Sequence, residues 1–136
     1  MEASISPSNQ MKLPYGLRAA KVAAERSTQP FKVGACLEFQ NQLIVAWNQS
    51  KTSPKAARWY EFYEGGQSHA EFNLFSNFIL DKLPLKRAKV YVYRQLPSTG
   101  ALALARPCKY CIQMLRFYSI LDIMYTVPGG YVQEKL

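Results

Sequence analysis

The chain's single histidine and a pair of closely spaced cysteines place the strongest constraint on its fold. His69-Ala70-Glu71 and Pro107-Cys108-Lys109-Tyr110-Cys111 each stand at the expected start of a helix, and a long stretch of chain separates them. Side chains and free N–H groups at helix starts often build metal and anion sites. A fold in which these side chains act together must therefore bring two helix starts to one place.

One neutral imidazole and two thiolates are a standard ligand set for zinc, and three protein ligands leave a fourth position open for water. His69, Cys108 and Cys111 are therefore expected to bind a catalytic Zn²⁺. Zinc can lower the pKa of bound water from about 15.7 to about 7. Glu71, two positions from the histidine, is expected to take that water's proton and pass it to a ring nitrogen and then to a leaving amine.

Composition limits the rest of the molecule to one soluble domain. The 136 residues are 49% hydrophobic and 19% charged, which supports a single packed core. Three cysteines are too few for a disulfide scaffold. No segment reaches the roughly 18 apolar residues that a bilayer requires, and the N-terminus lacks a signal-peptide pattern. We expect no membrane association and a reducing cytoplasmic location, where close cysteines more often bind metal or do redox chemistry.

The pattern of apolar residues predicts a polar tail over residues 1–11 and a mixed α/β domain over 12–136. Helices are expected from Leu13 to about Arg26, from 69 to about 83, and after Pro107, where the apolar stripe extends to Leu121. Strands are expected at 31–39, 43–47, 88–94, 123–127 and 131–136, with a short polar turn after Phe39. Gly34 weakens its strand unless another backbone or a ligand comes close to it.

His-x-Glu followed by Pro-Cys-x-x-Cys resembles the zinc-dependent cytidine and deoxycytidylate deaminase superfamily. The resemblance covers most of the chain, from about Leu13 to Leu136, and is strongest to small deaminases of phage type; a phage-encoded chain would be expected in the host cytoplasm. Those enzymes carry Asn-x-x-Lys-Thr-His-Pro after the second strand. Residues 48–54 follow this pattern with Ser53 in place of the histidine.

The resemblance implies a three-layer α/β/α domain with a mixed five-stranded sheet in the order 2-1-3-4-5. Only Pro128-Gly129-Gly130 separates the last two strands, and three residues cannot form a parallel crossover. The last pair should therefore be antiparallel, as in free-cytidine deaminases. A homo-oligomer is also implied, because deaminases of this size often build their pockets across subunits.

Carried over by position, the resemblance makes His69, Cys108 and Cys111 zinc ligands and Glu71 the proton shuttle. It makes Asn48 a contact to the sugar or base. It also directs the backbone N–H groups of Ala70 and Cys108 toward the base and the metal-bound hydroxide. The implied reaction is hydrolysis of a cytosine base to uracil with release of ammonia, on a free cytidine or deoxycytidine nucleoside or nucleotide. No residue separates cytosine from adenine as the base.

The formal charge of +8 favours anionic partners without separating free nucleotides from polynucleotides. Residues 51–63 mix Lys51, Lys55 and Arg58 with four aromatic residues, a composition that can bind phosphates and stacked bases. Lys51 is the substrate contact expected there. A deaminase of single-stranded DNA or RNA is therefore an alternative, although the aromatic residues of this segment can instead pack against the domain or a neighbouring subunit while its charges stay solvated. A second basic run, from Lys82 to Arg94, is typical of a solvated face but can also face phosphate.

Each motif also has a simpler interpretation. The cysteine pair can be a redox pair. Cys36 could complete a structural four-ligand zinc site, making the chain a non-enzymatic nucleic-acid-binding module, although a small buried residue is expected at that point of an apolar strand. Glu71 can form a capping box with Ser68, and Asn48 can simply terminate its strand. Each of these alternatives requires a different arrangement of the residues in space.

Overall fold

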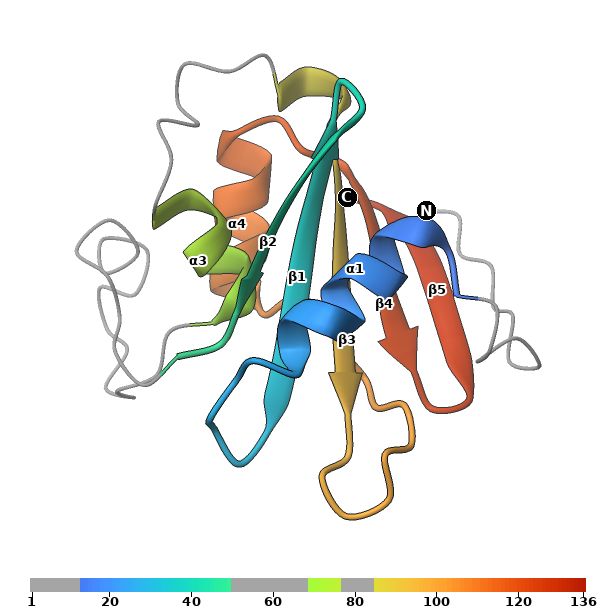
Figure 1. The fold of residues 1–136 in the computed structure, drawn as a ribbon. Coiled ribbons are helices and arrows are strands. Elements are labelled where there is room, and N and C mark those ends of the chain that lie inside the picture. The colour runs from blue at the N-terminus through green and yellow to red at the C-terminus, as the bar shows by residue number, and fades with distance from the viewer. Residues whose placement is uncertain (1–12, 50–68, 77–84) are drawn as a thin grey trace.

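The computed structural model describes residues 13–49, 69–76 and 85–136. Within them a five-stranded mixed sheet has the order β2-β1-β3-β4-β5 (Figure 1). Its β3–β4 pair is parallel and the other pairs are antiparallel, including β4 with β5. Both the strand order and the antiparallel last pair confirm the sequence prediction. In chain order the elements are α1 Tyr15–Ala24, β1 Lys32–Phe39, β2 Gln42–Trp47, α3 Ala70–Ser76, a 3₁₀ turn Leu85–Arg87, β3 Lys89–Gln95, α4 Lys109–Phe117, β4 Asp122–Val127 and β5 Gly130–Lys135.

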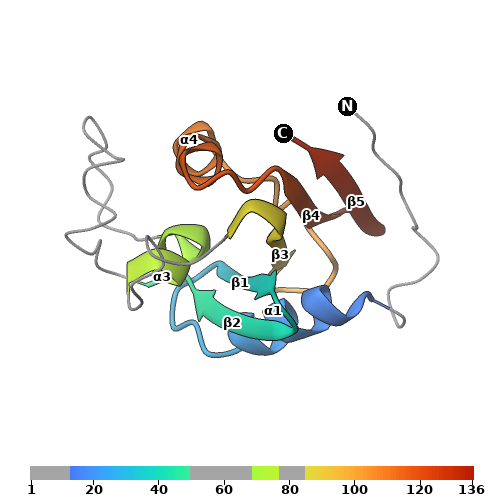
Figure 2. The ribbon, with the colours of Figure 1, turned by 90° about the horizontal axis from the view of Figure 1, so that it is seen from above.

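Helices cover both faces of the sheet, as Figure 2 shows with α1 below it and α3 and α4 above it. Alternate residues of each strand point to opposite faces. In β3, Val90 and Val92 join the core under α3 and α4, while Tyr91 and Tyr93 join the core under α1. The molecule therefore has the three α/β/α layers expected from the sequence. None of the described helices is long and apolar enough to cross a bilayer.

Two tight connections hold the sheet in register. Gln40 and Asn41 link β1 to β2 with positive φ values of 49° and 63°, the conformation of a two-residue hairpin turn. Gly129, with φ of 83°, turns β4 into β5. Asparagine and glycine tolerate this region of φ better than other residues do. Both connections occur where the sequence predicted short turns.

The end of α4 corrects one sequence prediction. Leu121 was expected on the buried stripe of this helix, but α4 ends at Phe117 and Leu121 is exposed. Ser119 adopts a φ of +61° and donates its N–H to Arg116, and Ile120 donates to the Leu115 carbonyl. This is the Schellman pattern, which here forms on serine instead of glycine. The sequence carried no glycine to mark the stop.

Several sequence predictions fall on residues outside the described ranges. They include the polar tail over 1–11, the basic aromatic segment 51–63, Ser68 as a capping residue and the second half of the helix predicted over 69–83. The division into tail and domain remains a prediction.

Gly34 is where α1 crosses β1 most closely. A Cβ atom built on Gly34 overlaps the carbonyl oxygen of Ala20 and lies 2.6 Å from the nitrogen of Ala24. Both obstacles are backbone atoms of α1, so they cannot rotate away. The close backbone approach that a strand glycine suggests is therefore present here.

Gly34→Ala is expected to lower the free energy of unfolding by about 3 kcal/mol, at the upper end of overpacking effects, because α1 must move off the sheet. Urea denaturation measures this loss. Lys32→Ala, at the exposed start of the same strand, serves as the control and should change stability little. Equal stability of Gly34→Ala and the native protein would contradict the packing described here.

Candidate active site

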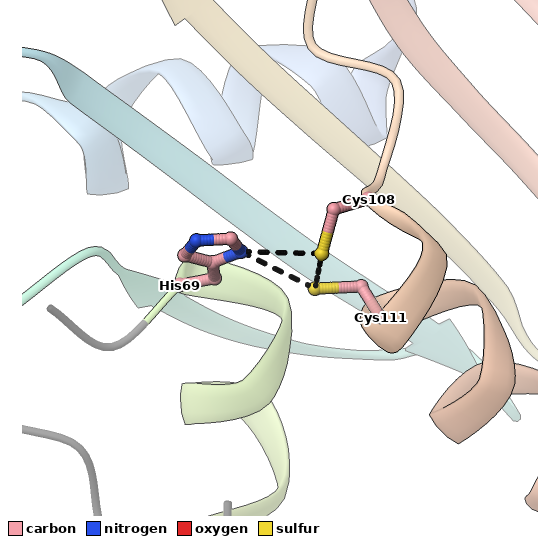
Figure 3. A group of neighbouring side chains, drawn as sticks. All are labelled: His69, Cys108 and Cys111. Atoms are coloured by element: carbon pink, nitrogen blue, oxygen red, sulfur yellow. Dashed lines mark hydrogen bonds between the residues drawn. The ribbon is translucent and has the colours of Figure 1, made fainter. Parts of the chain in front are cut away.

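His69, Cys108 and Cys111 converge (Figure 3), although α3 and β3 lie between His69 and Cys108 in the chain. His69 Nδ1 lies 3.6 Å from Cys108 Sγ and 3.5 Å from Cys111 Sγ, and the two sulfur atoms are 3.5 Å apart. His69 immediately precedes α3, and Cys108 is the N-cap residue of α4. The two helix starts therefore meet, as the motif spacing required.

The triangle of ligand atoms has the dimensions of a tetrahedral zinc site. Bonds of about 2.3 Å to sulfur and about 2.0 Å to nitrogen, at tetrahedral angles, place ligand atoms about 3.5 to 3.8 Å apart. The three observed separations fit this range. A neutral imidazole and two thiolates are also the donors that zinc prefers. These residues therefore fit Zn²⁺ with three ligands and one open position.

Contacts between α3, α4 and the sheet fix this triangle. Asn73 is buried, and its Nδ2 donates to the carbonyl of Trp47 at the end of β2 over 2.6 Å. Phe75 of α3 stacks on Tyr118 just after α4, with ring centroids 4.6 Å apart. Phe75, the aromatic residue of α3 whose side chain the structure describes, is thus core, as expected. It sets the distance between the two helices that carry the ligands.

The thiol and imidazole groups support one another electrostatically. Hydrogen bonds with Cys111 and then with His69 lower the pKa of the Cys108 thiol to about 4. The Cys108 hydrogen bond in turn raises the pKa of His69. A thiolate is the form of cysteine that binds metal. Cys108 is therefore held in the form that binds zinc.

Glu71 lies in the first turn of α3 and is buried. It is 4% exposed and lines a cavity of about 260 Å³ together with His69 and Cys108. Burial raises the pKa of its carboxyl group, and the nearby His69 opposes that rise. An N-terminal capping role alone does not need a carboxylate that faces a cavity. The position instead suits a group that exchanges protons with a bound molecule.

Asn48, which also lines this cavity, is held by backbone groups. Its Oδ1 accepts from the Val33 N–H over 3.0 Å, and its Nδ2 donates to the Phe31 carbonyl over 2.6 Å. These bonds tie the end of β2 to the start of β1, so the strand-terminating role is real. Asn48 nevertheless lines the cavity. One amide hydrogen and one lone pair remain for a ligand.

Two arginines, Arg94 and Arg106, line the same cavity, and neither was expected as a site residue. Arg94 ends the stripe of β3 residues that faces α3 and α4, two positions beyond Val92. From the sequence it belongs to a basic run that is typical of a solvated face but can also face phosphate, and the structure places it beside the site. Arg106 directly precedes Pro107-Cys108. The alternation of β3 could have indicated Arg94, but nothing in the sequence indicated what faces Arg106.

Arg106 forms an ion pair with Glu134 of β5. Its Nε and Nη2 donate to the two carboxylate oxygens over 3.0 and 2.8 Å, and Tyr125 donates its hydroxyl to the same carboxylate over 2.7 Å. The Arg106 hydrogen bond is the main reason that the pKa of Glu134 lies below its usual value. This pair anchors the segment that leads into Cys108.

Glu134→Gln is expected to destabilise the protein by about 2 kcal/mol at neutral pH, within the range for hydrogen bonds to charged groups. The folded-state pKa of Glu134 is depressed, so its contribution is present above the unfolded pKa of about 4.3 and is lost as pH falls through the folded value. Urea titrations at about pH 7 and about pH 3, which lie on either side of that pKa, measure the stability difference between the native protein and the variant. An equal stability gap at both pH values would contradict the assignment, and exposed Glu25→Gln is the control.

Cys36, the cysteine that a structural zinc module would need, does not join the site. Cys36 is fully buried and packs in the core beneath α1, on the opposite face of the sheet from Cys111. Burial raises its pKa to about 12. It cannot supply a fourth ligand, so the structural zinc module that required Cys36 is excluded. Lys51 lies outside the described residues.

Comparisons with known proteins agree with this geometry. A cytidine deaminase from Burkholderia pseudomallei has the same fold, with a TM-score of 0.62, 17% identity, and coverage of 90% of this chain and 93% of that one. The apo dCMP deaminase from cyanophage S-TIM5 is also similar, with a TM-score of 0.54 and 17% identity. The match covers 81% of this chain and 78% of that one. No curated protein sequence matches significantly. The pattern of the cytidine and deoxycytidylate deaminase zinc-binding region matches residues 11–127. With this match over most of its length and a His-Cys-Cys group built for Zn²⁺, the chain belongs to the cytidine and deoxycytidylate deaminase family of hydrolases.

Proposed function

We propose that this protein hydrolyses the amino group of a cytosine base, on a free cytidine or deoxycytidine nucleoside or nucleotide, to give uracil and ammonia. The observation that carries the proposal is the buried Glu71 carboxylate, which lines one cavity with two members of the zinc group. A deaminase needs a proton carrier beside its activated water. Glu71 is the carboxylate in the described part of this cavity.

Zinc, when bound, supplies Lewis acidity that makes water a competent nucleophile near neutral pH. The balance of the reaction is simple. The oxygen of water replaces the exocyclic nitrogen at the amine-bearing carbon, and two protons must travel from the water toward the ring and the departing amine. Glu71 accepts a proton on its carboxylate and returns it to the substrate. Its burial keeps bulk water from competing for that proton.

We propose further that the Ala70 and Cys108 backbone N–H groups contact the base and the attacking oxygen. They lie at the starts of α3 and α4 and both residues line the cavity. Asn48 would contact the sugar or base with its remaining amide hydrogen. Lys51 remains a proposed contact from the sequence pattern alone. Assembly into a homo-oligomer likewise remains a prediction.

A deaminase of single-stranded DNA or RNA is the second candidate, because the chain carries a formal charge of +8. An enzyme that contacts several phosphates weakens steeply as salt rises, whereas a nucleoside enzyme barely responds. Oligonucleotide binding that is flat with salt would exclude this candidate.

The proposal is tested by measuring ammonia release from cytidine, deoxycytidine, CMP, dCMP, adenosine and cytosine-containing oligonucleotides with the zinc-loaded protein. Activity on at least one free cytidine substrate is the expected result. Activity on adenosine alone, or on oligonucleotides alone, would overturn the choice of substrate. The profile across the series also separates ribose from deoxyribose.

A further inference from the structure

Arg94 is the charged group of the cavity that has no counter-charge among the described residues. Arg106 is neutralised by Glu134, and Glu71 lies beside the imidazole of His69. No acidic side chain in the described parts of the chain pairs with Arg94. Its Nε is buried and has no hydrogen-bond partner. A buried guanidinium N–H without an acceptor is costly, and such groups in native structures usually meet a ligand or water.

The backbone of Arg94 is held firmly at the end of the sheet. Its N–H donates to Thr126 Oγ1 over 3.1 Å, and its carbonyl accepts from the Ala103 N–H over 3.0 Å. The guanidinium carbon lies 5.0 Å from the centre of the Phe31 ring. Contacts at the backbone and at the guanidinium group therefore both hold the side chain in position. Such preorganisation reduces the entropy lost when a ligand binds.

Arg94 also lies in line with Asn48 across the sheet. Val33 of β1 is the register partner of Arg94, and the Val33 N–H donates to Asn48 Oδ1. Both residues line the cavity along its sheet side, while His69, Glu71 and Cys108 line its helix side. A ligand whose reacting base lies at Glu71 can therefore place its sugar and a further group along the Asn48–Arg94 edge.

We infer that Arg94 binds the phosphate of a pyrimidine nucleoside monophosphate, so that the protein prefers nucleotides to nucleosides. This inference rests on the proposed deaminase function and names the form of its substrate. Guanidinium groups bind phosphate through Nε and Nη together, and Nε is the atom left without a partner. A phosphodiester of a nucleic acid strand shares this chemistry, and the experiment separates the two sources.

The test compares kcat/KM for CMP and dCMP with that for the matching nucleosides, in the native protein and in Arg94→Gln. We expect the native protein to favour the nucleotides, and Arg94→Gln to lose tenfold to about a hundredfold more on nucleotides than on nucleosides, as expected for a charge-assisted hydrogen bond. Arg94→Lys, which keeps the charge without the planar fork, should recover part of the loss. Exposed Arg87→Gln should leave the preference unchanged.

Calorimetric titration of CMP and cytidine into the zinc-loaded native and Arg94→Gln proteins gives a readout that needs no turnover. A preference for CMP that depends on Arg94 supports the inference even if no substrate is deaminated, in which case the proposed function alone fails. Equal losses for CMP and cytidine would indicate a structural role for Arg94 and overturn the inference. An Arg94 dependence confined to cytosine oligonucleotides would overturn the monophosphate as its source.

Discussion

Glu71→Gln should lower kcat by at least about a thousandfold and leave bound zinc unchanged. Glutamine preserves the size of the side chain but cannot accept a proton. General acid–base groups contribute about a hundredfold to ten-thousandfold, and Glu71 is proposed to act at two successive proton transfers. A thousandfold loss corresponds to about 4 kcal/mol in activation free energy. Ammonia release measures the rate, and elemental analysis measures the zinc.

The matched control is Glu25→Gln, the same chemical change at an exposed position at the end of α1. It should keep both activity and zinc. Substantial turnover by Glu71→Gln would assign the proton transfers to another group. Loss of zinc together with activity would instead mean that Glu71 acts by holding the metal site together.

Cys111→Ser is expected to remove stoichiometric zinc and reduce activity to background, because a serine hydroxyl does not replace a thiolate ligand. Cys111 is fully buried within the core that α4 shares with the sheet. Bound zinc also stabilises the folded state by mass action, by about 4 kcal/mol when its concentration is a thousand times Kd. Zinc should therefore raise the thermal midpoint of the native protein but not of this variant.

Cys36→Ser is the matched comparison, since it changes the same group in the core beneath α1. It should retain stoichiometric zinc and the zinc-dependent shift in thermal midpoint. Zinc content and melting curves of the two variants, measured side by side, show which of the two cysteines binds the metal. Zinc lost from Cys36→Ser and kept by Cys111→Ser would reverse the assignment of ligands.

Much of the fold and the metal group could be predicted from the sequence because short-range rules govern them. The stripe of Leu17, Ala20 and Ala24 is buried in α1 as its spacing predicted. The three residues between the last two strands allowed only an antiparallel pair. The spacing of His69 and the cysteine pair indicated a zinc site, and the structure brings these residues together.

The remaining features depend on contacts between distant segments. Ser119 ends α4 through a left-handed conformation that serine rarely adopts, so Leu121 was misplaced. The pairing of Arg106 with Glu134 joins residues 28 positions apart, and no local pattern encodes it. Arg94 was grouped by charge with its neighbours in sequence, whereas strand alternation and the loop after β3 place it in the cavity.

The central claim is that zinc and Glu71 together replace the amino group of a cytosine with oxygen from water. Mass spectrometry of the products formed from cytidine, deoxycytidine and their monophosphates, in water labelled with heavy oxygen, tests it most directly. We predict a uracil product that carries one labelled oxygen, forms with the zinc-loaded native protein, and is absent after chelation or with Glu71→Gln. Failure of the zinc-loaded protein to convert any of these substrates, or a product without the label, would contradict that claim.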